Sequence, residues 1–393
     1  KVKLRSMFKA YGRKVGLGAT GTPFPNAMPQ AYVMLDYFRP DLLQAAEISA
    51  FSSFQAQYLA ETMAPEISPE GIPRIKERIG GFRNAKSFSQ LWKSMADVKT
   101  KHDLNLPVPD HTSETIVVPA TDADREYMAE IADRAEAVRA REVDASVDNL
   151  LKISNDGRLA AMDLRMVGMT PDGPGKLDAA ADKIAQIWQQ YKDHRYTDRE
   201  GNPSELTGAL QLVFADRGTA SEEAKKQGRF IAYDYLRDEL VKRGIPEDKI
   251  RYAQDAQTAE EKEKLFADAR AGKVAVLIGS TDTMGVGVNV QDRAIALHHL
   301  DCPWRPSDVT QREGRIIRQF NQHVTQGVPV QIYRWTKAGS FDAFMWQTVE
   351  RKARFIDQVR TGRELDEQDR ALDGDLGKDY LEYGEIKAIA TGN

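Results

Sequence analysis

Short, continuous apolar runs alternate with amphipathic stretches through the second half of the chain. Four runs have the length of strands that are buried on both faces, and they lie at residues 210–215, 274–278, 294–298 and 328–333. Residues 229–243 lie between the first two runs and have the pattern of a helix that ends at Gly244. Strands that alternate with helices in this way are joined by right-handed crossovers and form a parallel sheet. The pattern therefore predicts an α/β domain in which helices flank a parallel sheet.

The end of the chain has the pattern of one long helix followed by an acidic tail. Ser340 is a suitable N-cap, and from it we expect a helix that runs to about residue 360. The apolar residues on or near one face of this helix are Phe341, Phe344, Met345, Val349, Phe355 and Ile356. Acidic residues predominate from Glu364 to Asp379, and we assign 363–393 to a tail.

The first half of the chain has a different pattern, which predicts mainly helices. Residues 44–167 carry aromatic residues at helix-like spacing, and 122–143 has the composition of an amphipathic helix rich in Ala, Glu and Arg. One strand is expected within this region, at 114–118. Before it, a strand at 14–18 leads into a turn, and a helix follows at 30–38.

The composition is typical of a globular protein and argues against a membrane-spanning protein, a disulfide-stabilised protein and a CxxC zinc protein. Of the 393 residues, 41% are hydrophobic and 29% are charged, and no window reaches the run of about 20 apolar residues that a membrane helix requires. Cys302 is the only cysteine, which excludes an internal disulfide and a CxxC zinc site, and the six histidines do not suggest a metal site. The net charge of −4 argues against a protein that coats nucleic acid, but it is compatible with a local basic groove.

Residues 311–319, Gln-Arg-Glu-Gly-Arg-Ile-Ile-Arg-Gln, carry the strongest chemical signal. Ser307 is a suitable cap for a helix that runs through this segment. Such a helix would place Arg315 and Arg318 on one face, with Gln311 one turn earlier. Two guanidinium groups held on a rigid face can neutralise the charge that spreads over a γ-phosphate during its transfer. The alternative is a solvated basic helix face in which the arginines pair with neighbouring acidic residues.

A second signal follows the apolar run at 274–278. The segment 279–289 contains small hydroxyl residues and two glycines, Gly285 and Gly287. In a parallel sheet, ligands bind at the carboxyl ends of the strands, and small residues there let backbone N–H groups approach a phosphate. The alternative is an ordinary turn between a strand and a helix.

The order of these segments along the chain resembles that of the motifs in the Swi/Snf-like branch of superfamily 2 helicases. Motifs V and VI are similar to 281–289, 304–308 and 311–319, motif III to 20–26, motif IV to 212–216, and the signature that opens the second lobe to 175–177. Residues 341–352 are similar to the end of the helicase region in large methylase–helicase proteins of phages, plasmids and conjugative elements, which include anti-restriction proteins that protect incoming DNA. One departure is Met284-Gly285, where chromatin-remodelling relatives have two adjacent glycines.

The resemblance implies a motor with two RecA-like lobes, which binds ATP between the lobes and nucleic acid across both. Arg315 and Arg318 would be its catalytic arginine fingers. The residues implied near ATP are Gln311, Gly285, Gly287 and Asn289. Those implied near DNA are Ser280, Thr281 and Trp304, and packing is the alternative to base stacking for the tryptophan. Those implied to couple ATP to lobe movement are Thr20, Gly21 and Thr22.

Pattern and resemblance together divide the chain into four parts. They are 1–43, the end of the first RecA-like lobe; 44–167, a mainly helical protrusion; 168–362, the C-terminal RecA-like lobe with a brace helix; and 363–393, the acidic tail. A loop rich in Gly and Pro at 168–175 marks the boundary before the C-terminal lobe. The aromatic residues of 51–92 would form the core of the protrusion.

Two motifs that such a motor requires are missing from the sequence: the phosphate-binding loop GxxxxGK[ST] and the DExH box that holds magnesium. Residues 173–177 resemble the loop only in part, because Leu177 stands where a hydroxyl ligand for magnesium belongs and no apolar strand precedes them. Both motifs precede motif III in the family. We therefore expect the chain to begin inside the first lobe, as a truncated motor without significant ATP hydrolysis of its own, and we expect ATP and Mg²⁺ to bind only together with upstream residues.

Duplex DNA is the partner that the resemblance favours, together with the upstream lobe and a methyltransferase domain of the same parent protein. Such a protein would be encoded by a bacterium or a phage, act in the cytoplasm and have no membrane contact. The alternative is a helicase-like DNA clamp or docking module without ATP turnover, which the missing phosphate-binding loop supports. A third interpretation, a metabolic nucleotide-binding enzyme, would need GxGxxG after the first strand, and the sequence has none there.

Overall fold

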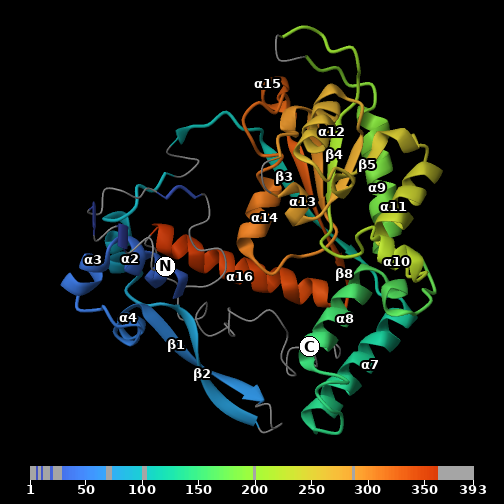
Figure 1. Cartoon of the computed structure of the whole chain (residues 1–393). Helices are drawn as coiled ribbons and strands as arrows, with labels where there is room; N and C mark the ends of the chain where they lie inside the picture. The colour runs from blue at the N-terminus through green and yellow to red at the C-terminus, as the bar shows by residue number, and fades with distance from the viewer. Residues whose placement is uncertain are drawn as a thin grey trace.

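Six parallel strands form the central sheet of the protein (Figure 1). The computed structural model describes residues 6–7, 10–11, 18–20, 29–67, 73–99, 104–197, 201–285 and 288–361. The strands of the sheet are β3 (His111–Val118), β4 (Leu210–Phe214), β5 (Ile250–Tyr252), β6 (Val276–Gly279), β7 (Ala294–His299) and β8 (Val330–Lys337). Their order is β3-β8-β7-β4-β6-β5, and each neighbouring pair is parallel. The RecA-like α/β fold predicted from the sequence is confirmed.

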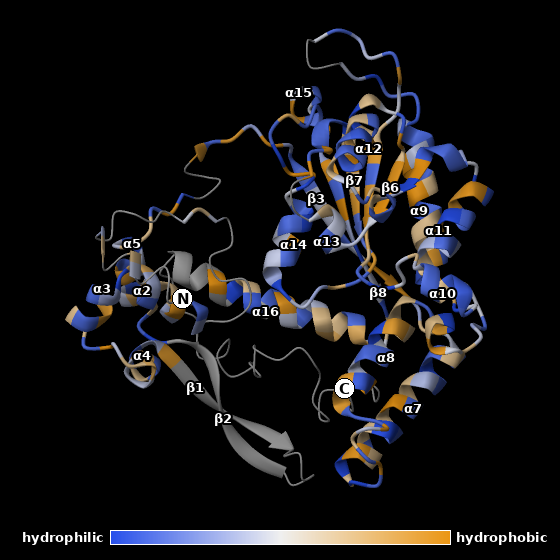
Figure 2. Ribbon diagram, in the orientation of Figure 1, coloured by the Kyte–Doolittle hydropathy of each residue, from blue (hydrophilic) through white to orange (hydrophobic). Residues whose placement is uncertain are grey.

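Helices cover both faces of this sheet. Those that pack on it are α9 (Lys176–Tyr191), α10 (Glu222–Lys226), α11 (Ala232–Lys242), α12 (Ala259–Ala271) and α13 (Thr281–Met284). The later helices of this half are α14 (Pro306–Glu313), α15 (His323–Gln326) and α16 (Phe341–Thr361). Because side chains alternate in direction along a strand, Val213 packs with α9 and α11, whereas Leu212 packs with α12 and α13 on the other face. Figure 2 shows the apolar colour of β6 and β7 between these helical layers.

The predicted elements of the second half match the observed ones closely. The four apolar runs are β4, β6, β7 and β8, and the helix expected at 229–243 is α11. Ser340 caps α16 as predicted, because its hydroxyl accepts the N–H of Asp342 at 3.2 Å. Strand β5 and helices α9 and α12 were not predicted. Short 3₁₀ turns lie at Leu164–Val167, Glu247–Lys249, Ala253–Asp255 and Gln291–Arg293.

The predicted domain boundary at residue 168 is wrong, because strand β3, which precedes it, belongs to the sheet of the C-terminal domain. The sequence predicted a strand here but placed it within the helical protrusion. In the structure β3 pairs along its whole length with β8, from His111 opposite Val330 to Val118 opposite Lys337. The edge of the C-terminal sheet is therefore built from a segment that lies well before the expected boundary.

Two helices, α7 (Asp122–Arg139) and α8 (Leu150–Met162), connect β3 to α9 and pack against the start of α16. Helix α7 is the amphipathic helix that the sequence predicted. Gly157 lies inside α8, where a glycine weakens a helix. The ring of Phe341 explains it, because a Cβ at position 157 would lie 2.4 Å from that ring.

The described residues of the N-terminal part form helices, of which α2 was predicted at 30–38, and a β-hairpin that the sequence did not predict. The elements are α2 (Pro29–Phe38), α3 (Pro40–Ala45), α4 (Phe51–Tyr58), β1 (Leu59–Ile67), β2 (Pro73–Phe82) and α5 (Ala85–Lys93). Buried aromatic residues form the core of the helices, as expected, and they include Phe54, Phe88 and Trp92. Ile356 of α16 packs against this core, so α16 joins it to the sheet domain (Figure 1). The strand expected at 14–18 lies outside the described residues except for Gly18.

None of the described helices is long and apolar enough to cross a membrane.

His298 lies at the centre of the sheet with both ring nitrogens engaged. Trp335 Nε1 donates to His298 Nδ1 at 3.4 Å, and His298 Nε2 lies 3.1 Å from Gln211 Oε1. Burial, followed by the neighbouring charge of His299, lowers the pKa of His298 to about 3. A neutral ring that accepts at Nδ1 and donates at Nε2 satisfies both bonds, whereas a protonated ring would lose the first of them.

We expect His298 to make the fold sensitive to acid. Its pKa in the folded state is about 3, below the ordinary value of 6.5, so between these values the unfolded chain binds a proton that the folded chain does not. Stability should therefore fall as the pH falls below 6.5, by about 1.4 kcal/mol per pH unit for this proton. Denaturant titrations at several pH values should show a smaller slope for His298→Gln. His111→Gln, at an exposed position of β3, is the control, and equal slopes in all three proteins would contradict the prediction.

Candidate nucleotide and nucleic-acid site

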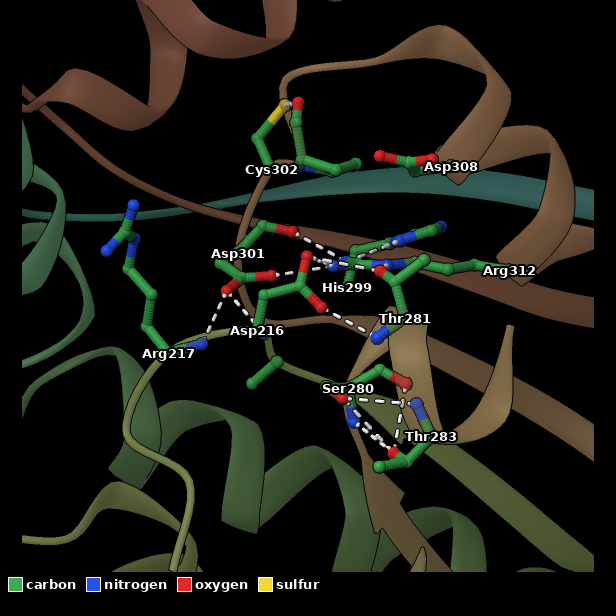
Figure 3. A network of polar contacts seen from close by, with 12 residues as sticks. Asp216, Arg217, Ser280, Thr281, Thr283, His299, Asp301, Cys302, Asp308 and Arg312 are labelled. Atoms are coloured by element: carbon green, nitrogen blue, oxygen red, sulfur yellow. Dashed lines mark hydrogen bonds and ion pairs between the residues drawn. The ribbon is translucent and has the colours of Figure 1, made fainter. Parts of the chain in front are cut away.

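The carboxyl ends of three neighbouring strands, β7, β4 and β6, meet at one edge of the sheet. Strand β4 leads to Asp216, β6 to Ser280 and Thr281, and β7 to Asp301. Arg312 reaches the same place from α14, as Figure 3 shows. This is the edge at which parallel sheets bind ligands, so we take it as the candidate site.

Arg312 connects the three strand ends through its guanidinium group, which has no exposed surface. Nη2 lies 2.7 Å from Asp216 Oδ2 and 3.1 Å from Asp301 Oδ1. Nη1 donates to the carbonyl of Asp301 at 3.0 Å, and Nε donates to the hydroxyl of Thr281 at 2.8 Å. The planar fork of an arginine can make all of these bonds at once, which a lysine cannot.

The charges in this cluster stabilise one another. Burial alone would lower the pKa of Arg312, but the carboxylates of Asp301 and Asp216 outweigh it, so the pKa is raised. Burial alone would raise the pKa of Asp301, but Arg312 and Arg158 hold it below its ordinary value. Asp301 also accepts the backbone N–H groups of Asp216 and Arg217, at 2.7 and 3.1 Å. The cluster therefore stays charged although it is buried.

Ser280 and Thr281, the predicted contacts to nucleic acid, are both engaged within the protein. Ser280 caps α13, where its hydroxyl accepts the N–H of Thr283 at 3.2 Å. The Thr281 hydroxyl accepts from Arg312 and donates to Asp216 Oδ2 at 3.1 Å, and its N–H donates to Asp216 Oδ1 at 2.7 Å. The Thr281 hydroxyl proton is thus committed to Asp216 in this conformation.

The two predicted arginine fingers converge on the loop that follows α13. Arg315 donates to the carbonyl of Gly285 from Nη2 and to that of Val288 from Nη1, both at 2.7 Å. Arg318 donates to the same Val288 carbonyl at 3.3 Å. Burial, followed by the charge of Arg318, lowers the pKa of Arg315. Two half-buried cations that share one carbonyl repel each other, and an anion beside them would relieve this repulsion.

The shared helix face predicted for these arginines is wrong. Helix α14 ends at Glu313, Gly314 is its C-cap, and the following residues form turns. Glycine favours helix termination, and the arginines gain carbonyl partners outside the helix. Ser307 is not the cap either, because Arg305 takes that position and Pro306 opens the helix.

The other residues assigned to ATP occupy less specific positions. Gly285 is sterically required, because a Cβ there would lie 2.2 Å from the carbonyl of Thr281. Gln311 is half-buried, and its carbonyl accepts from Arg315 Nε at 3.3 Å. Asn289 is exposed, and its carbonyl accepts from Arg270 at 2.7 Å. Gly287 lies outside the described residues.

The geometry of Trp304 favours the packing alternative over base stacking. The guanidinium of Arg158 covers its ring at 4.9 Å from the centroid. The indole also packs against two hydrophobic clusters that include residues of α16. Of the predicted coupling residues, Thr20 is exposed, and Gly21 and Thr22 lie outside the described residues.

Lys176, the lysine of the partial phosphate-loop motif, does not face a ligand site. It is the first residue of α9, it is fully buried, and its Nζ lies 2.7 Å from Asp342 Oδ2. Asp342 also accepts the N–H of Lys337 at 3.0 Å, and Lys337 Nζ lies 2.6 Å from Asp124. These buried ion pairs hold α9, α16, β8 and α7 together. The interpretation of 173–177 as something other than a phosphate loop agrees with this geometry.

Arg312, Asp216 and Asp301 were not identified as site residues from the sequence. Asp216 directly follows the apolar run at 210–215, and Asp301 lies three positions after the run at 294–298. A position just after a buried parallel strand is the signal that could have identified them, because ligands bind at that end of the strands. Arg312 belongs to the same 311–319 motif as Arg315 and Arg318, and the sequence analysis assigned a catalytic role only to those two arginines. Its partners Asp301, Thr281 and Asp216 lie 11, 31 and 96 positions upstream.

Comparison with known proteins identifies helicase-like sequence in the part of the chain that carries the site. Residues 221–319 match the family described as "Helicase conserved C-terminal domain". This segment includes Thr281, Arg312 and both predicted arginine fingers, and the match supports a helicase C-terminal region here.

Two individual proteins are also similar to this chain. One is "Defense against restriction protein B" of Escherichia phage P1, which is 31% identical over 97 residues, or 25% of this chain and 4% of the phage protein. The chain therefore matches only a small part of that much longer relative. The other is the crystal structure of the C-terminal part of the Fun30 ATPase domain, with 12% identity and a TM-score of 0.44, covering 72% of this chain and 96% of that one.

Lys176→Met tests whether this lysine has a structural role. The substitution leaves Asp342 buried without its cationic partner, and breaking such a pair costs about 3–5 kcal/mol. Denaturant unfolding should show this loss, and Lys176→Met combined with Asp342→Asn should recover part of it, because the uncompensated charge is then removed. A single variant as stable as the unmodified protein would contradict the structural role.

Proposed function

We propose that this chain supplies the C-terminal half of an ATP-dependent DNA translocase or helicase of the Swi/Snf-like branch of superfamily 2. The observation that carries the proposal is the pair Arg315 and Arg318, which converge at the carboxyl edge of a parallel sheet within the helicase-like segment 221–319. In this role the pair would leave the carbonyls of the 285–288 loop and turn to the γ-phosphate of ATP. Guanidinium groups bind phosphate oxygens more strongly than neutral carbonyls.

ATP would lie between this lobe and an upstream lobe that carries the phosphate-binding loop and the DExH box. Mg²⁺ would be held by that upstream lobe. The described part of this chain contains no group of three or more His, Cys, Asp or Glu residues placed to hold a metal ion. Gln311 and the Gly285 loop would border the nucleotide, and Arg315 and Arg318 would neutralise charge on the transferring phosphoryl group.

Duplex DNA would cross the carboxyl edge near Ser280 and Thr281. The likeness to a phage protein named for defense against restriction supports DNA as the nucleic acid, because restriction acts on DNA. A methyltransferase domain in the same parent protein is a further partner that we propose from the resemblance of 341–352. The net charge of −4 means that binding would depend on a local basic surface.

A DNA clamp or docking module without ATP turnover is the second candidate. The sequence lacks a phosphate-binding loop, and the lysine of the one partial match is buried against Asp342. Under this alternative the chain would bind duplex DNA, but ATP would not alter the binding.

Arg318→Ala in the complete polypeptide, in which this chain is joined to the upstream lobe, separates these candidates. If Arg318 is an arginine finger, DNA-stimulated ATP hydrolysis should fall on the order of 10³-fold or more. Arg229→Ala is the control, because Arg229 is an exposed arginine of the same domain. The measurement is steady-state phosphate release with and without duplex DNA.

An unchanged rate in Arg318→Ala would remove the arginine-finger role. The absence of DNA-stimulated hydrolysis in the unmodified polypeptide would favour the clamp. Duplex binding that weakens steeply with salt would then be its expected signature, because contacts to phosphates release counterions.

A further inference from the structure

Three arginines of one short segment hold both ends of a second segment. The first segment is 312–318, and the second is 281–288, of which 281–285 and 288 are described. Arg312 binds the beginning of the second segment at Thr281. Arg315 and Arg318 bind its end, at the carbonyls of Gly285 and Val288. A displacement of either segment therefore acts on the other.

The attachment at Thr281 is the more rigid of the two. Arg312 and Asp216 both contact the Thr281 hydroxyl, and they also contact each other at 2.7 Å. Three polar groups thus form a closed ring of interactions around one hydroxyl. Asp301 binds the same guanidinium group, so Arg312 and Thr281 cannot move apart without breaking several charged hydrogen bonds.

The attachment at 285–288 is of a different kind. Its acceptors are neutral carbonyls, and its donors are two half-buried cations that repel each other. An anion that draws Arg315 and Arg318 away would release the end of the segment. Its beginning would stay joined to Arg312, three residues before Arg315 on the same short stretch of backbone.

We propose that Arg312 is a positioning residue that transmits the state of the arginine pair to Thr281. This inference rests on the proposed function, in which Arg315 and Arg318 meet ATP and the segment at Thr281 meets DNA. Movement of the arginines toward a phosphate shifts the 312–318 turn, and the Arg312 fork carries that shift to Thr281 and Asp216. Arg312 contacts neither ATP nor DNA in this arrangement, and it acts through Thr281.

The experiment measures coupling in the complete polypeptide, with Arg312→Lys and Thr281→Val as single and double variants. The quantity is the ratio of kcat for ATP hydrolysis with saturating duplex DNA to kcat without it. Arg312→Lys keeps the charge but loses the fork, and Thr281→Val keeps the shape but loses the hydroxyl. Each should lower the ratio about tenfold, the size of a typical coupling between two sites.

The double variant tests whether the two residues act through one contact. If they do, its ratio should lie within about twofold of the lower single variant, because the second change removes nothing further. Arg293→Gln is the matched control. Arg293 is equally buried and binds Leu206 and Ser204 in the same domain, without contact to Thr281, so its loss should lower the melting temperature and leave the ratio unchanged.

Four results would overturn the inference. If Arg312→Lys lowers both rates by the same factor, as Arg293→Gln would by loss of stability, Arg312 has only a structural role. If the two single variants multiply in the double variant, Arg312 does not act through Thr281. If the unmodified polypeptide shows no DNA stimulation, the proposed function fails and the inference fails with it. If Arg312→Lys does not fold, a normal ratio in Thr281→Val overturns it.

Discussion

The buried cluster of Arg312, Asp216 and Asp301 is the interaction on which the arrangement of this protein's functional edge depends. A charge in a protein interior is tolerated only when partners and hydrogen bonds replace the water it has lost. Here the partners come from the ends of β4 and β7, and Thr281 after β6 completes the set. Hydrophobic packing aligns the strands, but it does not fix the loops that follow them. The cluster does this, and it places residues from four separate segments at one edge.

The same physical rule operates at the carboxyl end of β8, at the same edge of the sheet. Lys176 and Lys337 lie buried against Asp342 and Asp124, and together with the Lys337 N–H bond to Asp342 they tie α9, α16 and α7 to β8. A glycine-rich sequence that ends in lysine therefore has opposite meanings in two contexts. After a buried strand it wraps a phosphate, whereas here it begins a helix and neutralises an aspartate. The residue pattern alone does not distinguish a phosphate-binding lysine from a structural one. The group that the lysine contacts, a phosphate or an aspartate, distinguishes them.

Much of the sheet domain could be predicted from the sequence, because parallel strands that are buried on both faces have continuous apolar sequences. The predictions failed where a distant partner decides the structure. Strand β3 was recognised as a strand, but its pairing with β8 depends on a contact that no local pattern contains. The hairpin of β1 and β2 was missed within a region whose aromatic residues indicated helices.

The candidate site shows the same division between local and distant information. Arg315 and Arg318 were selected from their motif, yet the turn that carries them depends on Gly314 and on carbonyl partners about 30 positions away. Arg312 was passed over because a buried arginine and an exposed one look alike in sequence. What distinguishes it is the pair of aspartates, and their proximity follows from the strand order.

The pairing of β3 with β8 also determines when the fold can form during synthesis. The hydroxyl of Thr336 in β8 bonds the carbonyl of Ile116 in β3 across 220 positions of sequence. At ribosomal speeds of about 5–20 residues per second, β3 leaves the ribosome roughly 10–40 s before β8 exists. Ile116, Val117 and Val118 of β3 lack a partner throughout that interval, because β8 is the strand that pairs with β3 in the folded sheet. The nascent chain is therefore exposed to strand-to-strand aggregation at this segment, which a chaperone that binds short apolar stretches would counteract.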